Sequence, residues 1–299
     1  MLTEAIALYR SPRRAECAER SFVLQAVGIE SELSRVEGEY VLWVDAGSAE
    51  AARAHLVQYE QEQRRWRWRR QTVAVVPRPP APHALLGSAL YVAVLLFVAY
   101  AAGSGLWRLD AFDRGDLDAG LVQHAQWWRA WTALTLHLDP AHIAANIAAG
   151  VWFGALAGRL LGPGHAWALI VLGAGAANLI EALLATPDHR SAGASTAVFT
   201  ALGLLSAYAW VERRTLALHW AARLGPLVAG VMLLGWLGTE GEHTDVMAHL
   251  IGFGVGAVLG ALAALGNAQR LLRTIPQWVT GAAALGMIAL AWFCALVRP

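Results

Sequence analysis

Two residues of the sequence, Ser195 and His249, are of the types that together cleave an acyl bond. Ser195 lies in the segment Gly193-Ala194-Ser195-Thr196, and His249 lies in an apolar segment further along the chain. A serine hydroxyl becomes a nucleophile when a nearby imidazole accepts its proton. We therefore predict that Ser195 is a nucleophile and that His249 is its general base.

His142 and Asn146 have the chemistry needed to stabilise the negative charge of such a reaction. They are four residues apart, so they share one face of a helix. Imidazole and amide N–H groups can donate hydrogen bonds to a developing oxyanion. We expect these two side chains and the backbone N–H of Ser195 to fill this role.

Each of these residues also has a plain structural explanation. Ser195 has the chemistry of a helix N-cap, and His249 could be a packed histidine that bonds a neighbouring carbonyl. His142 and Asn146 could form a hydrogen-bonded pair between helices. Catalysis is favoured because the residues together supply every role that acyl transfer needs.

The composition predicts that these residues lie in a membrane. Of the 299 residues, 57% are hydrophobic and only 15% are charged, whereas soluble proteins average about 25% charged residues. The charges are frequent up to residue 83 and sparse from Ala84 onward. We predict an all-α polytopic membrane protein that carries a small α/β module at its N-terminus.

The same change in composition suggests four parts. Residues 1–63 form the α/β module, with a helix in 12–27, strands at 32–36 and 39–45, and a second helix from Ala49 to about Gln63 that Ser48 caps. Residues 64–83 form a basic, aromatic and proline-rich linker. Residues 84–266 form a six-span domain, and residues 267–299 add one further span.

The linker contains the run Arg64-Arg65-Trp66-Arg67-Trp68-Arg69-Arg70. Arginines at anionic headgroups and tryptophans at the interface are typical of a membrane anchor. Binding of phosphates by the arginines is the weaker alternative. The net charge is only +1, so we expect the lipid bilayer as the partner of this segment and no nucleic acid.

Seven apolar segments have lengths that suit a hydrocarbon core of about 30 Å. They lie near residues 84–102, 141–161, 165–185, 194–211, 221–238, 246–266 and 277–297. Arginines cluster in alternate loops, and the positive-inside rule places those loops in the cytoplasm. The N-terminus is then cytoplasmic, and the C-terminus and the long loop at about 103–140 lie outside.

This topology places the candidate site residues at one depth. Ser195 begins the fourth span, and His249 lies a few residues inside the sixth, which is roughly 5–8 Å at 1.5 Å per residue. Gly252, Gly256 and Gly260 share the helix face of His249 and permit close helix approach. A stripe of Ser195, Phe199, Gly203 and Ser206 on the fourth span is expected to meet that face.

The residues resemble those of the rhomboid intramembrane serine proteases over about 84–266. The matching segments are Trp128-Arg129, His137-Leu-Asp-Pro-Ala-His142-Ile-Ala-Ala-Asn146, Gly193-Ala194-Ser195 and the run Ala248-His249 to Gly256. Their order, and their separation by whole spans, match as well. The N-terminal module is similar to the small cytoplasmic domain that some bacterial members carry.

The resemblance implies a six-helix core with a Ser195–His249 dyad and an oxyanion site of His142, Asn146 and the Ser195 amide. It implies that Phe199 packs against the catalytic histidine and that Arg129 holds the first outer loop. Supporting roles fall to His137, Gly193, Gly252 and Gly256. The expected substrates are transmembrane proteins cut near the outer face of the membrane, and the expected location is a bacterial inner membrane.

The sequence departs from the family at two positions and in its seventh span, near 277–297, which lies beyond the basic six. The residue after the serine is usually glycine and here is Thr196, whose bulk we expect to narrow the site or alter its specificity. An acidic residue near the end of the second span is replaced around Gly158. This replacement affects a contact at a helix end rather than catalysis.

Several other functions are less consistent with the sequence. A Ser–Lys dyad is excluded because the chain has no lysine, and no HExxH motif indicates a zinc protease. Cys17 and Cys294 lack metal-ligand spacing, so neither metal nor cofactor is expected. An aspartyl protease needs two acidic residues in spans, and only Glu181 qualifies. A transporter would have inverted repeats, and the sequence shows none. The main alternative is a catalytically inactive rhomboid-like protein that escorts membrane proteins.

Overall fold

The computed structural model describes residues 4–69, 83–107, 110–214, 220–237 and 245–297, without the side chains of residues 64–69. The chain divides into two compact units, residues 1–76 and 77–299. The predicted proline-rich segment at 77–82 lies outside the described residues, as do the arginine and tryptophan side chains predicted to anchor the chain.

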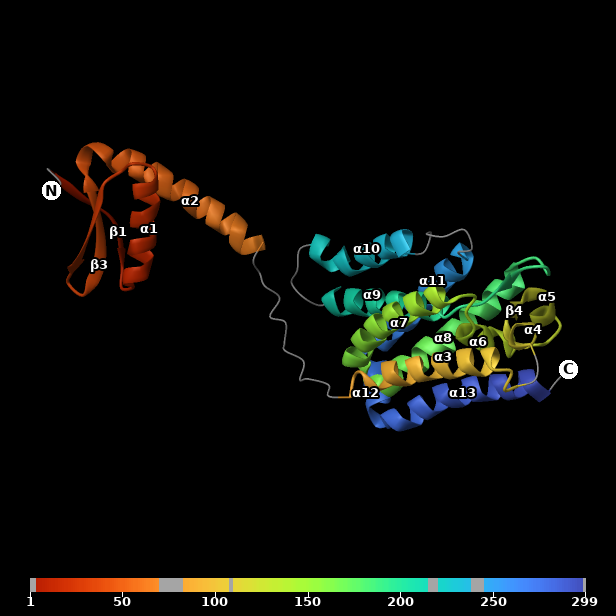
Figure 1. Cartoon of the computed structure of the whole chain (residues 1–299). Helices are drawn as coiled ribbons and strands as arrows, with labels where there is room; N and C mark the ends of the chain where they lie inside the picture. The colour runs from red at the N-terminus through yellow and green to blue at the C-terminus, as the bar shows by residue number, and fades with distance from the viewer. Residues whose placement is uncertain (1–3, 70–82, 108–109, 215–219, 238–244, 298–299) are drawn as a thin grey trace. The chain divides into compact units, whose positions relative to one another are not determined.

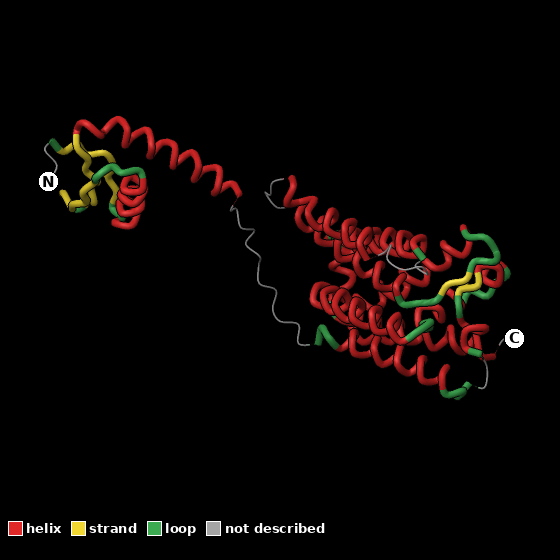
Figure 2. Tube along the Cα trace, turned by 45° about the horizontal axis from the view of Figure 1, so that its top comes forward, coloured by secondary structure: helices red, strands yellow, loops and turns green. Residues whose placement is uncertain are grey.

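The first unit is a three-stranded antiparallel sheet with two helices (Figure 2). Its strands are β1 (Ala5–Ser11), β2 (Ser31–Val36) and β3 (Glu39–Asp45), in the order β1-β3-β2. The helices are α1 (Arg14–Ala26) and α2 (Ala49–Arg69), and a short 3-10 helix, η1 (Ala46–Ser48), precedes α2. Leu24, Leu42 and Val44 are fully buried between sheet and helices.

The predicted helix–hairpin–helix pattern is confirmed, but three details were wrong. The strand β1 was not predicted, because its place depends on pairing with β3 far along the chain. Ser48 belongs to η1, which Asp45 caps by accepting the Gly47 N–H. The second helix does not end near Gln63 but continues to Arg69.

The second unit is a bundle of long helices that run beside one another (Figure 1). Each of the seven predicted spans corresponds to a helix: α3 (Leu86–Gly103), α7 (Pro140–Leu161), α8 (Pro163–Leu184), α9 (Ser195–Arg214), α10 (Trp220–Leu237), α11 (Val246–Ala263) and α13 (Gln277–Val297). A short helix, α12 (Gly266–Thr274), precedes α13.

Five of these helices, α3, α7, α8, α11 and α13, are long and apolar enough to cross a membrane. The chain is therefore an all-α polytopic membrane protein with a small N-terminal α/β module. The helix α9 is less apolar, but most of its residues from Thr196 to Tyr208 are buried by neighbouring helices. A helix that is covered by protein needs no uniformly apolar surface.

The contact between α9 and α11 is the most extensive helix contact among the described residues. A side chain at Gly252, Gly256 or Gly260 would meet the backbone carbonyls of Thr196, Thr200 and Leu204, respectively. On α9, a side chain at Gly203 would meet the carbonyl of Phe253. The predicted glycine ridge is thus a backbone-to-backbone contact, as small residues permit between membrane helices.

Ser206 does not belong to this contact, contrary to expectation. Its hydroxyl donates to the Leu202 carbonyl at 2.7 Å, within α9, and it lies against Gly230 of α10. The angular step of a helix explains the difference, because Ser206 is three residues beyond Gly203 and is turned toward the next neighbour.

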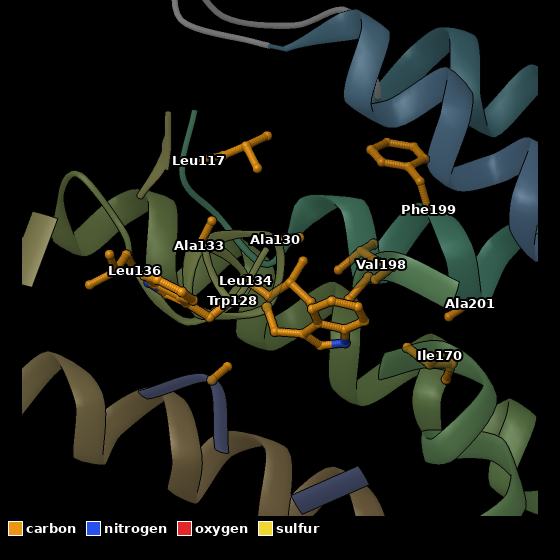
Figure 3. Packing of buried hydrophobic residues seen from close by; sticks show 14 of the residues in the cluster. Leu117, Trp128, Ala130, Ala133, Leu134, Leu136, Ile170, Val198, Phe199 and Ala201 are labelled. Carbon is orange, nitrogen blue, oxygen red and sulfur yellow. The ribbon is translucent and has the colours of Figure 1, made fainter. Parts of the chain in front are cut away.

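The connection between α3 and α7 folds against the bundle instead of projecting from it. It contains α4 (Ala111–Gly115), β4 (Leu117–Asp118), α5 (Ala119–Gln123), α6 (Arg129–Thr132) and η2 (Ala133–Thr135), and β4 pairs with β5 (Arg190–Ser191). Trp128, Leu134 and Leu136 pack in one buried cluster with Val198 and Phe199 of α9 (Figure 3).

Hydrogen bonds join this connection to α8. Asn178 of α8 donates to the Ala130 carbonyl at 2.8 Å, and the Trp131 indole donates to the Val171 carbonyl at 3.2 Å. Non-helical backbone at membrane depth needs such partners. The connection can therefore lie beside apolar spans without unpaired polar groups at these positions.

The last helix, α13, is attached to the bundle at both of its ends. Gln277 accepts the N–H groups of Gly164 and His165 at the start of α8 and donates to the Leu161 carbonyl. Near the other end, the Trp292 indole donates to the Thr135 hydroxyl at 3.0 Å. Through this bond, α13 supports the α3–α7 connection.

We predict that Gly256→Ala destabilises the bundle by about 1–3 kcal/mol, because the added methyl group must push two helix backbones apart. The matched control is Gly254→Ala on the same helix, where a methyl group meets nothing within 4 Å. Thermal unfolding in detergent is the measurement. Equal midpoints for the two variants would contradict the proposed tight contact.

Candidate active site

The candidate site residues gather at the N-terminal ends of α7, α9 and α11. The contacts of Gly252 with Thr196, Gly256 with Thr200 and Gly260 with Leu204 have the same sequence separation. This register means that α9 and α11 run parallel. One turn before Gly252, His249 then lies beside the start of α9, where Ser195 is located.

An aromatic contact fixes the imidazole of His249 on this side of α11. The rings of Phe199 and His249 lie 4.3 Å apart between centroids, with planes inclined by 34°. Phe199 is one turn beyond Ser195 on α9, and it projects from that helix in Figure 3. His249 is only 5% exposed, whereas Ser195 is half-buried.

Ser195 is not the N-cap of its helix, which removes its plain structural explanation. The Ala194 carbonyl accepts the Val198 N–H at 3.1 Å, so Ala194 occupies the capping position and Ser195 is the first helical residue. The Ser195 N–H then belongs to the first turn, where backbone N–H groups have no partner within the helix.

Gly193 lies against both the His142 ring and the Ser195 hydroxyl. Its φ is +150°, and an added side chain would meet the His142 ring at 2.9 Å and the Ser195 hydroxyl at 3.6 Å. Its N–H donates to the Ala133 carbonyl at 3.0 Å. Only glycine fits both this conformation and this space.

His137 fixes the next residue of the segment. The Ala194 N–H donates to Nε2 of His137 at 3.3 Å, and the His137 and His142 rings meet edge to face at 5.0 Å. Burial lowers the pKa of His137 to about 4. Because Nε2 accepts this bond, the neutral ring carries its hydrogen on Nδ1.

Asn146 lies one turn beyond His142 on α7 and is 5% exposed. Its amide Nδ2 donates to the His142 carbonyl at 3.1 Å, within α7. The Tyr91 hydroxyl donates to the Asn146 carbonyl at 2.9 Å. An amide nitrogen has two hydrogens, so a second donor remains after the bond to His142.

Two aspartates that were not among the predicted site residues cap the helices of the site. Asp139 caps α7 by accepting the His142 N–H at 2.8 Å, and Pro140 follows it. Asp245 caps α11 by accepting the Ala248 N–H at 3.0 Å. An aspartate directly before an apolar helix is a recognisable N-cap signal, so the sequence could have shown both.

Arg129 lies away from this group and acts within the α3–α7 connection. The guanidinium donates to the Asp116 carboxylate at 2.8 Å, to the Asp113 carbonyl at 2.6 Å and to Gln126. The second carboxylate oxygen of Asp116 accepts from Arg190 at 2.7 Å. The buried Asp116 thereby links Arg129 to the segment that leads into Ser195.

The two unusual positions of the sequence have structural reasons. The Thr196 methyl group lies 3.2 Å from the point where Gly252 would carry a side chain, so the absence of a side chain at Gly252 accommodates the bulk of Thr196. A side chain at Gly158 would meet the Ala84 carbonyl at 2.7 Å. No acidic residue fits there without moving that backbone.

Comparison with known proteins gives a family for this part of the chain. Residues 124–265 match the rhomboid domain. Rhomboid protease GluP of Bacillus subtilis (strain 168) is 30% identical over 162 residues, which cover 54% of this chain and 32% of that protein. Rhomboid-like protease 2 of Toxoplasma gondii is 29% identical over 149 residues, which cover 47% of this chain and 49% of that protein. The chain thus spans half or less of each relative.

The bond from Ala194 to His137 predicts a pH dependence of stability. The pKa of His137 falls to about 4 in the folded protein, against about 6.5 in an unfolded chain. The unfolded chain therefore binds more protons between these values, and stability is present above about pH 6.5 and is lost as the pH falls toward 4.

We expect His137→Gln, which keeps an acceptor but does not titrate, to show a shallower loss of thermal stability between these pH values than the unaltered protein. Thermal unfolding in detergent at a series of pH values is the measurement. The matched control is His124→Gln, at an exposed histidine of the same connection. Parallel pH profiles for His137→Gln and the unaltered protein would contradict the assignment.

Proposed function

Because residues 124–265 belong to the rhomboid family, we propose that this chain is an intramembrane serine protease that hydrolyses peptide bonds of transmembrane proteins. Ser195 is the nucleophile and His249 the general base. The observation that carries the proposal is the parallel contact of α9 and α11, whose register puts both residues at the starts of their helices. The stacking of Phe199 on His249 supports it.

In the proposed reaction, His249 takes the proton of Ser195 as the hydroxyl oxygen attacks the carbonyl carbon of the substrate. The carbonyl oxygen becomes an oxyanion, and the protonated His249 then gives its proton to the leaving amine. The acyl group stays on Ser195 until a water molecule, deprotonated by His249, attacks it. Neither step requires an acidic third member, a metal or a cofactor.

The oxyanion would lie where three donors converge. His142 is within contact of Gly193 beside Ser195, and the Ser195 N–H lies in the first turn of the 20-residue α9. That helix end also carries partial positive charge. Asn146, one turn deeper, would turn its remaining amide hydrogen toward the same point. Such donors act chiefly in the transition state.

The remaining expected residues hold these groups in place. Gly252 and Gly256 let α11 approach α9, Gly193 leaves room for His142, and His137 fixes the Ala194 amide. Arg129 orders the α3–α7 connection through Asp116. Preorganised surroundings of this kind allow donors to act without reorganisation during the reaction.

The expected membrane setting follows from the arginine distribution. We propose a multi-pass protein of a bacterial inner membrane, with a cytoplasmic N-terminal module and the site toward the outer face. Substrates are cut near that face, where Ser195 and His142 are both half-buried rather than enclosed. The Thr196 methyl group occupies the space where Gly252 lacks a side chain. We therefore expect Thr196 to change the shape of the site and not the reaction itself.

We predict that a fluorophosphonate labels Ser195 of the purified protein and that Ser195→Ala removes the label. Ser206→Ala is the matched control, since it removes from the same helix a hydroxyl that donates to the Leu202 carbonyl. Mass spectrometry of the labelled peptide is the measurement. Either absence of labelling or equal labelling of Ser195→Ala would contradict the assignment of Ser195 as nucleophile, and absence of labelling would favour an inactive escort protein.

A second prediction concerns Asn146. Replacing it with alanine should lower the turnover of a transmembrane model substrate by about 10²–10³, with little change in KM, because the lost donor acts on the oxyanion. Tyr91→Phe is the control, since it removes a bond to the Asn146 backbone and leaves the amide side chain intact. An unchanged turnover with a raised KM would assign Asn146 to substrate binding.

A further inference from the structure

A second group of ionisable side chains lies close to the start of α11. We propose that Glu181, His189 and Asp245 bind one divalent transition-metal cation, with Zn²⁺ as the representative ion. One ligand atom from each residue lies within 4.8 Å of the others. The three residues form no metal-binding motif in the sequence, which therefore predicts no metal site.

The two carboxylates lie within hydrogen-bond reach of each other and share one imidazole. Glu181 is 1% exposed, and neither its Oε2 atom nor the Oδ2 atom of Asp245 receives a hydrogen bond from any other residue that the structure describes. The other oxygen of Glu181 lies 3.2 Å from Nε2 of His189, and Oδ2 of Asp245 lies 3.2 Å from the same nitrogen. Unpaired buried carboxylate oxygens are costly, so this group is short of positive charge or donors.

No arginine among the described residues supplies that charge. Arg190 follows His189 directly, but it is bonded to Asp116 at 2.7 Å and lies 4.0 Å from Asp113 and Asp118. A protonated His189 would balance only one of the two carboxylates. One divalent cation would balance both and would take up their unpaired oxygens as ligands.

The ligand types indicate which cation fits. Two carboxylates and one imidazole are a set that zinc and similar transition metals accept. Ca²⁺ and Mg²⁺ prefer oxygen ligands alone. Three protein ligands leave a fourth position for water, and the half-buried His189, with 30% of its side chain exposed, leaves the group open to solvent on one side.

The ligands belong to three different parts of the bundle. Glu181 is in the last turn of α8, His189 is in the connection that continues into Ser195, and Asp245 is the N-cap of α11. A cation would therefore join the segment before Ser195 to the start of the helix that carries His249. Its role would be structural, and its binding does not depend on the proposed proteolysis.

The test uses the full chain, free of any histidine tag, purified in detergent and stripped of metal with a chelator. It is titrated with Co²⁺, whose visible absorption reports nitrogen and oxygen ligation, and the bound Co²⁺ is then displaced with Zn²⁺. We expect one equivalent of Co²⁺ to bind and Zn²⁺ to raise the thermal unfolding temperature.

Glu181→Gln, His189→Asn and Asp245→Asn should each weaken binding by about tenfold or more, as loss of a metal-site group does. Asparagine is itself a good N-cap, so Asp245→Asn keeps the start of α11 and removes only the charge. The matched control is Asp188→Asn, in the same connection but outside the group, and it should bind as the unaltered protein does.

The proposal is overturned if Co²⁺ binds without a ligand-field spectrum, if less than one equivalent binds, or if Asp188→Asn weakens binding as much as the three ligand variants do. A proton shared by Glu181 and Asp245 would then be the means of balancing the charge. Fluorophosphonate labelling of the same preparation is independent of these results, so failure of this proposal and failure of the protease proposal are distinguishable.

Discussion

The close parallel contact of α9 and α11 is the constraint on which the site depends. Where glycines of one helix lie against carbonyls of the other, neither helix can slide or rotate without a backbone collision. The register is therefore fixed, and with it the relative height of Ser195 and His249. Van der Waals packing of this kind is a main attraction between helices in a bilayer. Lipid tails are as apolar as the helix surfaces, so the hydrophobic effect does not drive the helices together.

The α3–α7 connection meets a different requirement, because it has irregular backbone beside apolar helices. Arg129 and Asn178 supply its carbonyls with donors from within the protein, and its Trp131 indole donates in turn to a carbonyl of α8. The same connection provides the Ala133 carbonyl and the His137 ring that hold Gly193 and Ala194. Order in this connection is thus transmitted through hydrogen bonds to the residue before Ser195.

The buried carboxylates at this end of the bundle differ in how many basic side chains balance their charge. Asp116 is buried between Arg129 and Arg190 and is paired on both oxygens, whereas Glu181 and Asp245 share the imidazole of His189 as their only ion-pair partner among the residues that the structure describes. This contrast is the reason why we propose a bound cation at Glu181 and Asp245 and not at Asp116. Both groups anchor the segment that leads into α9, one from the connection and one from α8 and α11.

Much of this protein followed from the sequence alone. Apolar lengths located the seven helices, and the spacing of Gly252, Gly256 and Gly260 from His249 identified the face that meets α9, because helix periodicity is a local property. The pairing of β1 with β3, the turn of Ser206 toward α10 and the meeting of Glu181, His189 and Asp245 join distant segments. Only the tertiary structure decides such contacts, since they depend on which helix faces pack together.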